Sequence, residues 1–154
     1  MNKPPTFIFL LHDIDRLLQK RFEQREKGLG LPHLYWQALA FLNLNEGIHQ
    51  SGLAEILAVH PFVLVRILDK LEQLGLVERR RHLGDRRTWH LYLREAAHPL
   101  LAEIRDIANA TWDESLDGLP DDALADLLET LTLLKTNLIE ACHTTADDRK
   151  SSHG

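Results

Sequence analysis

The amino-acid sequence predicts a mainly α-helical fold that includes one small β-hairpin. Along most of the chain, apolar residues recur at intervals of three and four positions, which is the spacing of one face of a helix. Between residues 76 and 93 the interval shortens to two, as in a strand with one buried face. With 154 residues, of which 44% are hydrophobic and 27% charged, the chain has the size and composition of one soluble domain with its own core.

Four helices are predicted ahead of the hairpin. Gly28 follows the first helix, Pro32 suits the first turn of the second, and Gly75 suits the residue just beyond the fourth. The predicted helices cover residues 7–22, 32–45, 51–57 and 61–74.

The hairpin is predicted from two strands, residues 76–80 and 88–93, joined by a tip at residues 81–87. In the second strand three apolar side chains alternate with three polar or amphipathic ones. The tip contains a Gly-Asp pair suited to a turn and three arginines. This segment therefore combines a turn with a concentration of positive charge.

Two long helices are predicted after the hairpin, over residues 95–116 and 121–142. A Gly-Leu-Pro sequence beginning at Gly118 separates them. The remaining residues, 143–154, are polar, and we expect them to form a disordered tail.

This order of elements predicts a winged helix-turn-helix over about residues 32–94. In such a fold the second helix of the pair enters the major groove of DNA, and the hairpin reaches an adjacent groove or the backbone. The charge distribution agrees. Residues 66–94 carry eight basic and four acidic side chains, whereas residues 95–154 carry four and thirteen. The basic excess therefore coincides with the end of that helix and the hairpin, where a polyanion would bind.

Composition argues against several other classes of protein. No apolar run reaches the roughly 18 residues of a spanning helix, and the first residues lack a signal-peptide pattern, so we expect a cytoplasmic protein without membrane association. The single Cys142 excludes an intramolecular disulfide and is expected to be a free thiol. The sequence has no phosphate-binding glycine loop and no nucleophile elbow, so we expect neither an enzyme nor a cofactor.

The chain resembles the MarR family of bacterial transcriptional regulators, and its SlyA-like branch in particular, over roughly residues 5–142. The resemblance is most specific in the run from Leu64 to Arg80 and in the wing. There the family signature of Asp, any residue, Arg, three residues, Leu, any residue, Leu is matched by Asp85, Arg87, Leu91 and Leu93. Two further matches are Trp36 in the second helix and Leu53-Ala54 in the third.

The resemblance implies a single domain, residues 1–154, in which residues 5–28 and 95–142 form the dimerisation helices around the DNA-binding lobe. It further implies a homodimer that binds a pseudo-palindromic operator in double-stranded DNA as a repressor or an activator. Several relatives bind aromatic carboxylates or phenols, so a small-molecule effector is implied as well. The aromatic and polar residues available to line its pocket are His33, Tyr35 and Trp36, which the alternative assigns to core packing.

The sequence departs from the family pattern at three places. The start of the fourth predicted helix is apolar from Phe62 to Val65, where the family usually has small hydroxyl residues. Arg94 replaces a threonine after the wing signature, and His49 stands where a capping threonine is expected at the head of the third helix. These changes bear on how DNA is contacted and leave the core positions apolar.

The candidate DNA contacts divide into reading and positioning groups. Arg87 is suited to the minor groove, and Arg66 to a guanine or a phosphate; each is otherwise a solvated arginine. Phe62 and Val65 are suited to thymine methyl groups, or else pack inward or against a partner. Asp85 is expected to hold a neighbouring arginine. The full set of predicted contacts is Phe62, Val63, Val65, Arg66, Lys70, Arg79, Arg80, Arg81, Asp85, Arg86 and Arg87.

Two alternative functions depend on specific residues. The apolar start of the fourth helix is also compatible with a winged-helix module that binds protein and has weak or no DNA binding. The pairs His82 with His90 and His12 with His33 raise the question of a metal site, but their spacing lacks the i, i+4 pattern of ligands on one helix, so no metal is predicted.

Overall fold

The structure is a computed structural model that describes residues 6–82 and 84–151, with the side chains of all of these except 85, 86 and 145–151. The described residues divide into two compact units, one that ends at Asp113 and one that begins at Glu114. Its helices and strands are α1 (Thr6–Arg25), the short 3₁₀ helix η1 (Glu26–Gly28), α2 (His33–Leu44), α3 (Gln50–Leu57), α4 (Pro61–Gln73), β1 (Val77–His82), β2 (Asp85–Leu93), α5 (Ala97–Ser115) and α6 (Asp121–Ser151). The predicted fold class, mainly helical with one antiparallel hairpin, is confirmed.

Helices α3 and α4 form a helix-turn-helix. Their axes are bent by 111° across a three-residue break, within the range of about 90–120° usual for this motif. Ala58 begins the break in the left-handed conformation, with φ of 52°, and its N–H donates to the carbonyls of Ala54 and Glu55. His60 then caps α4, since its Nδ1 accepts the N–H of Phe62 at 3.2 Å and Pro61 occupies the first turn.

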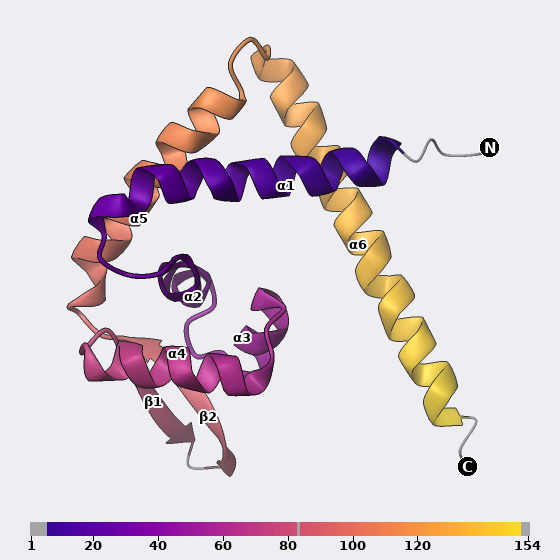
Figure 1. Cartoon of the computed structure of the whole chain (residues 1–154). Coiled ribbons are helices and arrows are strands. Elements are labelled where there is room, and N and C mark those ends of the chain that lie inside the picture. The colour runs from indigo at the N-terminus through magenta and orange to yellow at the C-terminus, as the bar shows by residue number, and fades with distance from the viewer. Residues whose placement is uncertain (1–5, 83, 152–154) are drawn as a thin grey trace. The chain divides into compact units, whose positions relative to one another are not determined.

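The hairpin β1–β2 is the wing of this motif. Val77 pairs with Leu93 at its base and Arg81 with Trp89 nearer its tip, and the register shifts between Arg81 and His82. Gly47 and Ile48, which precede α3, exchange hydrogen bonds with Leu91 at 2.8 and 3.0 Å and so attach that segment to β2. The wing extends away from the lobe beside α4 (Figure 1).

The main core lies inside this lobe, where the apolar faces of the helices meet the base of the wing. Buried residues come from α2, α3, α4, both strands and the start of α5, which explains why the apolar spacing of each segment predicted its structure. The fully or almost fully buried large side chains are Leu39, Leu42, Leu53, Leu64, Leu68, Leu71, Leu91 and Val77.

The strands are longer than the sequence predicts. The tip expected over residues 81–87 is mostly strand, because pairing continues to His82 and Asp85. Arg81 lies opposite Trp89 with its guanidinium 4.4 Å from the ring centroid, and such cross-strand pairs stabilise a two-stranded ribbon. The alternation of polar and apolar residues ends before this pairing does, so it underestimates the strand length.

Helix α6, in the second unit, is also longer than expected. The predicted end at Cys142 and the disordered tail from residue 143 are wrong as far as residue 151, because α6 continues to Ser151. Thr144 Oγ1 bonds to the Glu140 carbonyl at 3.0 Å, so this polar side chain is accommodated within the helix. Over the part of the chain that is described, no single helix is long and apolar enough to span a membrane.

Candidate nucleic-acid interface

Helix α4 has one buried and one exposed face. Leu64, Ile67, Leu68 and Leu71 are buried in the core, as the spacing of four apolar positions requires. On the other face Phe62 is 76% exposed and Val63 41% exposed. Val65 is half-buried, whereas Arg66 and Lys70 are exposed. The predicted reading residues therefore share an accessible face, and that face begins with apolar side chains.

Phe62, the most exposed of these residues, is held in place by His60 at the start of α4. Its ring stacks on His60, with centroids 5.2 Å apart and planes 13° from parallel. The same His60 caps the helix through the N–H of Phe62. One imidazole therefore fixes both the backbone and the ring of Phe62, which limits the side-chain entropy lost when a partner covers it.

Arg79 does not lie on the exposed surface of the wing. Its side chain is 13% exposed and points at α4, where its guanidinium donates to Asp69 at 2.7 Å, to Glu72 at 3.1 Å and to the Val65 carbonyl at 3.3 Å. Its backbone N–H donates to Glu72 as well, at 3.3 Å. The sequence predicts Arg79 as a DNA contact, but both terminal nitrogens of its guanidinium are bonded to α4, so we assign it the role of holding the wing against that helix.

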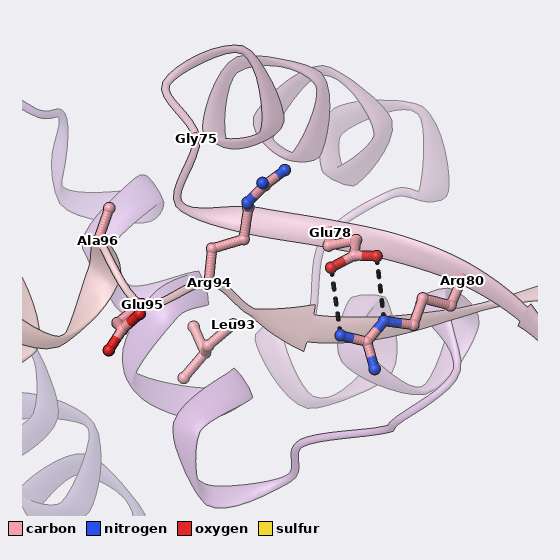
Figure 2. Close-up of a pocket in the computed structure, with 7 residues that line it drawn as sticks. All are labelled: Gly75, Glu78, Arg80, Leu93, Arg94, Glu95 and Ala96. Carbon is pink, nitrogen blue, oxygen red and sulfur yellow. Dashed lines mark hydrogen bonds and ion pairs between the residues drawn. The ribbon is translucent and has the colours of Figure 1, made fainter.

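Arg80 and Arg81 stand on the wing over aromatic rings. Arg80 lies 4.2 Å from the centroid of Tyr92 and forms a two-point ion pair with Glu78 at 3.1 and 3.2 Å, drawn as dashed lines in Figure 2. The hydrogen bond from Arg80 lowers the pKa of Glu78, and the same bond raises the pKa of Arg80. Both arginines remain exposed on the wing.

An open pocket of about 600 Å³ lies at the base of the wing next to this ion pair. Two acidic and two basic side chains contribute to its lining, so it has no excess of either charge and no preference for an anion. Its lining residues, shown in Figure 2, are Gly75, Glu78, Arg80, Leu93, Arg94, Glu95 and Ala96.

Arg87 lies on β2 and is exposed, in keeping with a group that reaches beyond the wing. The backbone of Asp85 pairs with His82 at the end of the ladder. The side chains of Asp85 and Arg86, both predicted contacts, lie outside the described residues.

A second cavity, of about 180 Å³, lies between the wing and the head of α3. Around this cavity Arg87 lies close to residues that could not be predicted as site residues from the sequence, because they are distant from Arg87 in the chain and form no motif. The lining residues are His49, Gln50, Ser51, Arg87, Thr88 and Trp89. The signal available in the sequence was His49, which replaces the usual capping residue.

Three imidazoles form a row beside this cavity. The ring centroids of His49 and His90 are 4.2 Å apart, and those of His90 and His82 are 4.0 Å apart. His90 Nδ1 is 3.0 Å from the Gly47 carbonyl, so that nitrogen carries its proton. The sequence pair His82 and His90 therefore does converge. Among the residues that the structure describes, no group of three or more His, Cys, Asp or Glu side chains is arranged to hold a metal ion.

The candidate effector residues divide between two clusters. Tyr35 packs on the main core, whereas Trp36 belongs to a second cluster with Phe22 and Ile104. Phe22 stacks on Trp36 with ring centroids 3.9 Å apart, and His33 meets the Trp36 ring edge-on at 4.3 Å. The structure thus brings His33 and Trp36 together and separates Tyr35 from them.

A buried carboxyl group completes this second cluster. Glu26 is 9% exposed, and its Oε2 lies 3.7 Å from His33 Nδ1. Burial raises the pKa of Glu26, while the charge of His33 and the indole N–H of Trp36 oppose the rise. Polar atoms of all three residues are buried without a hydrogen-bond partner in the described part of the chain. Leaving a buried polar group unpaired costs free energy. The hydrogen-bonding capacity of this cluster is therefore incompletely satisfied.

Comparisons with known proteins give a consistent result. A family model described as the MarR family matches residues 29–88. The solved structure of transcriptional regulator PA3341 is 31% identical, with a TM-score of 0.78, and the match covers 87% of this chain and 98% of that one. A MarR-family regulator from Silicibacter pomeroyi is 25% identical, with a TM-score of 0.75 and coverage of 84% and 87%.

A third structure is similar in fold. It is a putative MarR-family transcriptional regulator from Listeria monocytogenes, complexed with 26mer DNA. It is 22% identical, with a TM-score of 0.76 and coverage of 86% of this chain and 89% of that one.

Proposed function

The chain belongs to the MarR family of transcriptional regulators, and on that premise we propose that it acts as a homodimer on a pseudo-palindromic site in double-stranded DNA. The observation that carries the proposal is the exposed face of α4, from Phe62 to Lys70, beside a wing that presents Arg80, Arg81 and Arg87. A helix for the major groove and a basic ribbon for the adjacent backbone are the two parts of winged-helix recognition. The similar Listeria protein was solved with DNA.

Within this proposal the residues of the interface have different tasks. Arg66, Lys70, Arg80 and Arg81 provide charge for phosphates, which contributes affinity and salt dependence. Arg87 enters the minor groove. The exposed rings and methyl groups at the start of α4 contact thymine methyl groups, which are the apolar feature of the major groove.

Dimerisation is supported by apolar side chains that remain exposed on two helices. Exposed large apolar side chains on α1 are Phe7, Ile8, Phe9, Leu10, Leu11, Ile14 and Leu17, and those on α6 are Leu127, Leu128, Leu133, Leu138 and Ile139. Concentrations of this size mark interaction surfaces on soluble proteins. We therefore assign residues 5–28 and 95–142 to the dimer interface and about residues 32–94 to the DNA-binding lobe. A two-fold dimer accounts for a pseudo-palindromic site.

The proposal includes a small aromatic effector that binds near His33 and Trp36. The unpaired polar atoms and aromatic faces of that cluster support it, since ligand sites combine apolar walls with a few polar groups. The protein has no enzymatic role in this account, and it acts in the cytoplasm.

A second function is favoured by one observation. Phe62 is 76% exposed at the start of α4, and an exposed ring of this kind also suits a protein partner. In that alternative the winged helix binds protein, and DNA binding is weak or absent.

Fluorescence anisotropy with a duplex from the DNA that flanks the gene separates the two functions. We expect the wild type to bind this duplex more tightly than a scrambled duplex of equal composition. We expect Arg87→Ala to weaken binding by about 1–3 kcal/mol, chiefly through the A·T-rich flanks. Equal and weak binding to both duplexes, with a folded protein by circular dichroism, supports the protein-binding alternative.

A further inference from the structure

We propose that Phe62, at the start of α4, recognises the C5-methyl group of a pyrimidine in the major groove, whether that pyrimidine is thymine or 5-methylcytosine. Methylation of cytosine at the contacted position then strengthens DNA binding. The inference rests on the proposed DNA-binding function and goes beyond its thymine contacts, because it makes the affinity depend on a chemical modification of the DNA.

The backbone N–H groups in the first turn of α4 are used within the protein. Pro61 has no N–H, and the N–H of Phe62 donates to His60 Nδ1 at 3.2 Å. The N–H groups of Val63 and Leu64 both donate to the His60 carbonyl, at 2.9 and 3.2 Å. A helix end usually binds a phosphate through N–H groups that lack a partner inside the protein. This helix end is therefore poorly suited to a phosphate.

The exposed side chains of the same turn are apolar. Phe62 is 76% exposed and Val63 41% exposed, and the first charged side chain along α4 is Arg66. Neither of the two exposed side chains forms hydrogen bonds with a base edge, so this turn distinguishes bases by apolar contact. The apolar feature of the major groove is the methyl group on C5 of thymine, and 5-methylcytosine carries the same group on the same atom.

The charges around Phe62 favour DNA over an apolar protein partner. Arg66 and Lys70 follow Phe62 at intervals of four residues on one face of α4, and both are exposed. The carboxylates of Asp69 and Glu72 on this helix are bonded to an arginine of the wing. A partner that covers Phe62 therefore meets two cations on the same face. The major groove suits this arrangement, because its base edges lie between two rows of phosphates.

His60 positions the ring that makes the proposed contact. The two rings stack with centroids 5.2 Å apart and planes 13° from parallel. Because His60 Nδ1 accepts the Phe62 N–H, the proton of the neutral imidazole is on Nε2. That group is a hydrogen-bond donor at the same helix end, so its effect on specificity has to be measured separately from the effect of the methyl contact.

Duplexes that differ only in methyl groups test this specificity. In the duplex that flanks the gene, thymines are replaced by uracil one symmetric pair at a time, and the affinity is measured by fluorescence anisotropy. At the thymine that contacts Phe62 we expect binding to weaken by about two- to fourfold for each methyl group removed. At the same position, cytosine and 5-methylcytosine are then compared, each paired with guanine. We expect the methylated duplex to bind more tightly by a similar factor.

Phe62→Ser shows whether the ring causes these differences. Since Phe62 is exposed, we expect this variant to fold as stably as the wild type, which circular dichroism checks. Uracil also changes the stacking and stiffness of DNA, so the effect of the ring is taken as the coupling in a double-mutant cycle between protein and base. We expect Phe62→Ser to bind the methylated and unmethylated duplexes equally. His60→Asn retains a capping side chain and removes the Nε2 donor, and we expect it to keep the preference for the methyl group.

The matched control is Leu44→Ser at the end of α2, because Leu44 is a large apolar residue of nearly equal exposure, at 77%. We expect it to keep the wild-type ratio of affinities. If the wild type distinguishes the flanking duplex from a scrambled one without any dependence on methyl groups, the inference is wrong and the proposed function stands. A dependence that persists in Phe62→Ser also contradicts the inference. If the wild type does not distinguish the flanking duplex from the scrambled one, the proposed function has failed, and the inference fails with it.

Discussion

Arg79 of the wing and Asp69 of α4 are joined by a 2.7 Å hydrogen bond between guanidinium and carboxylate. The same guanidinium holds Glu72 and the Val65 carbonyl. One side chain therefore connects the two parts of the interface, and it does so from a position that is 13% exposed. The wing is positioned relative to α4 by this contact, together with the core at the base of the hairpin.

Replacing Arg79 by Met keeps the apolar stem and removes these hydrogen bonds. We expect the free energy of unfolding to fall by about 1–3 kcal/mol, because Asp69 and Glu72 lose their hydrogen bonds to a charged partner. Urea denaturation measures the change. Arg80→Met is the matched control, and because Arg80 is exposed we expect it to cost much less than Arg79→Met. Unchanged stability of Arg79→Met, with a smaller salt dependence of DNA binding, would place Arg79 on a phosphate.

Ala58 in the helix-turn-helix break has φ of 52°, a conformation that costs a residue with a side chain roughly 1–2 kcal/mol. Glycine adopts it without that cost. We expect Ala58→Gly to raise the free energy of unfolding by up to about 1 kcal/mol, since the freer unfolded chain offsets part of the gain. Thermal and urea unfolding measure it. A destabilised Ala58→Gly would show that the Ala58 side chain contributes packing that outweighs the strain.

The raised pKa of Glu26 has a defined consequence for stability. Its cause is burial, opposed by the nearby His33. Since the folded state holds this proton more tightly than the unfolded state, the stabilisation is fully present below the ordinary value of 4.5 and is lost as the pH rises through the raised value. We expect Glu26→Gln to lack this loss, so its stability relative to the wild type should increase as the pH rises from 4.5 through the raised value, and should stay constant above it.

Denaturation of both proteins at a series of pH values checks this expectation. Glu23→Gln removes the other carboxylate near His33, whose negative charge also raises the pKa of Glu26, so in this variant the loss of stability should be complete at a lower pH. A difference between Glu26→Gln and the wild type that stays constant with pH would contradict the assignment.

The exposed apolar side chains of α1 predict the oligomeric state. Sedimentation of the wild type at micromolar concentration should give twice the chain mass of 17.7 kDa. Phe9, at 66% exposed, is one of the most accessible of these residues, and we expect Phe9→Glu to shift the protein toward the single-chain mass because it places a charge in an apolar interface. Gln73→Glu, an exposed change in α4 outside the proposed dimer interface, should leave the dimer intact. A wild type of single-chain mass would remove the basis for two-fold recognition.

Spacing along the sequence predicted the helices and the wing because core positions such as Leu64 and Leu91 recur with the period of the element that carries them. The ends of the strands were harder to predict. Arg81 and Trp89 extend the hairpin through a contact between strands, and spacing within one strand contains no information about it. Likewise, an arginine that binds phosphate and one that binds Asp69 are identical in the sequence. Only the fold distinguishes Arg79 from Arg80, and only the fold brings Ser51 close to Arg87.

Hydroxyl-radical footprinting on the DNA that flanks the gene, repeated over a range of salt concentrations, tests the central claim most directly. The account predicts two protected half-sites with centres separated by about one helical turn or a multiple of it, as a two-fold dimer requires. It also predicts that log K falls steeply with log salt, and that Arg81→Ala reduces the slope by about one. Protection that does not depend on sequence, or no protection at low salt with a folded dimer, would contradict the claim.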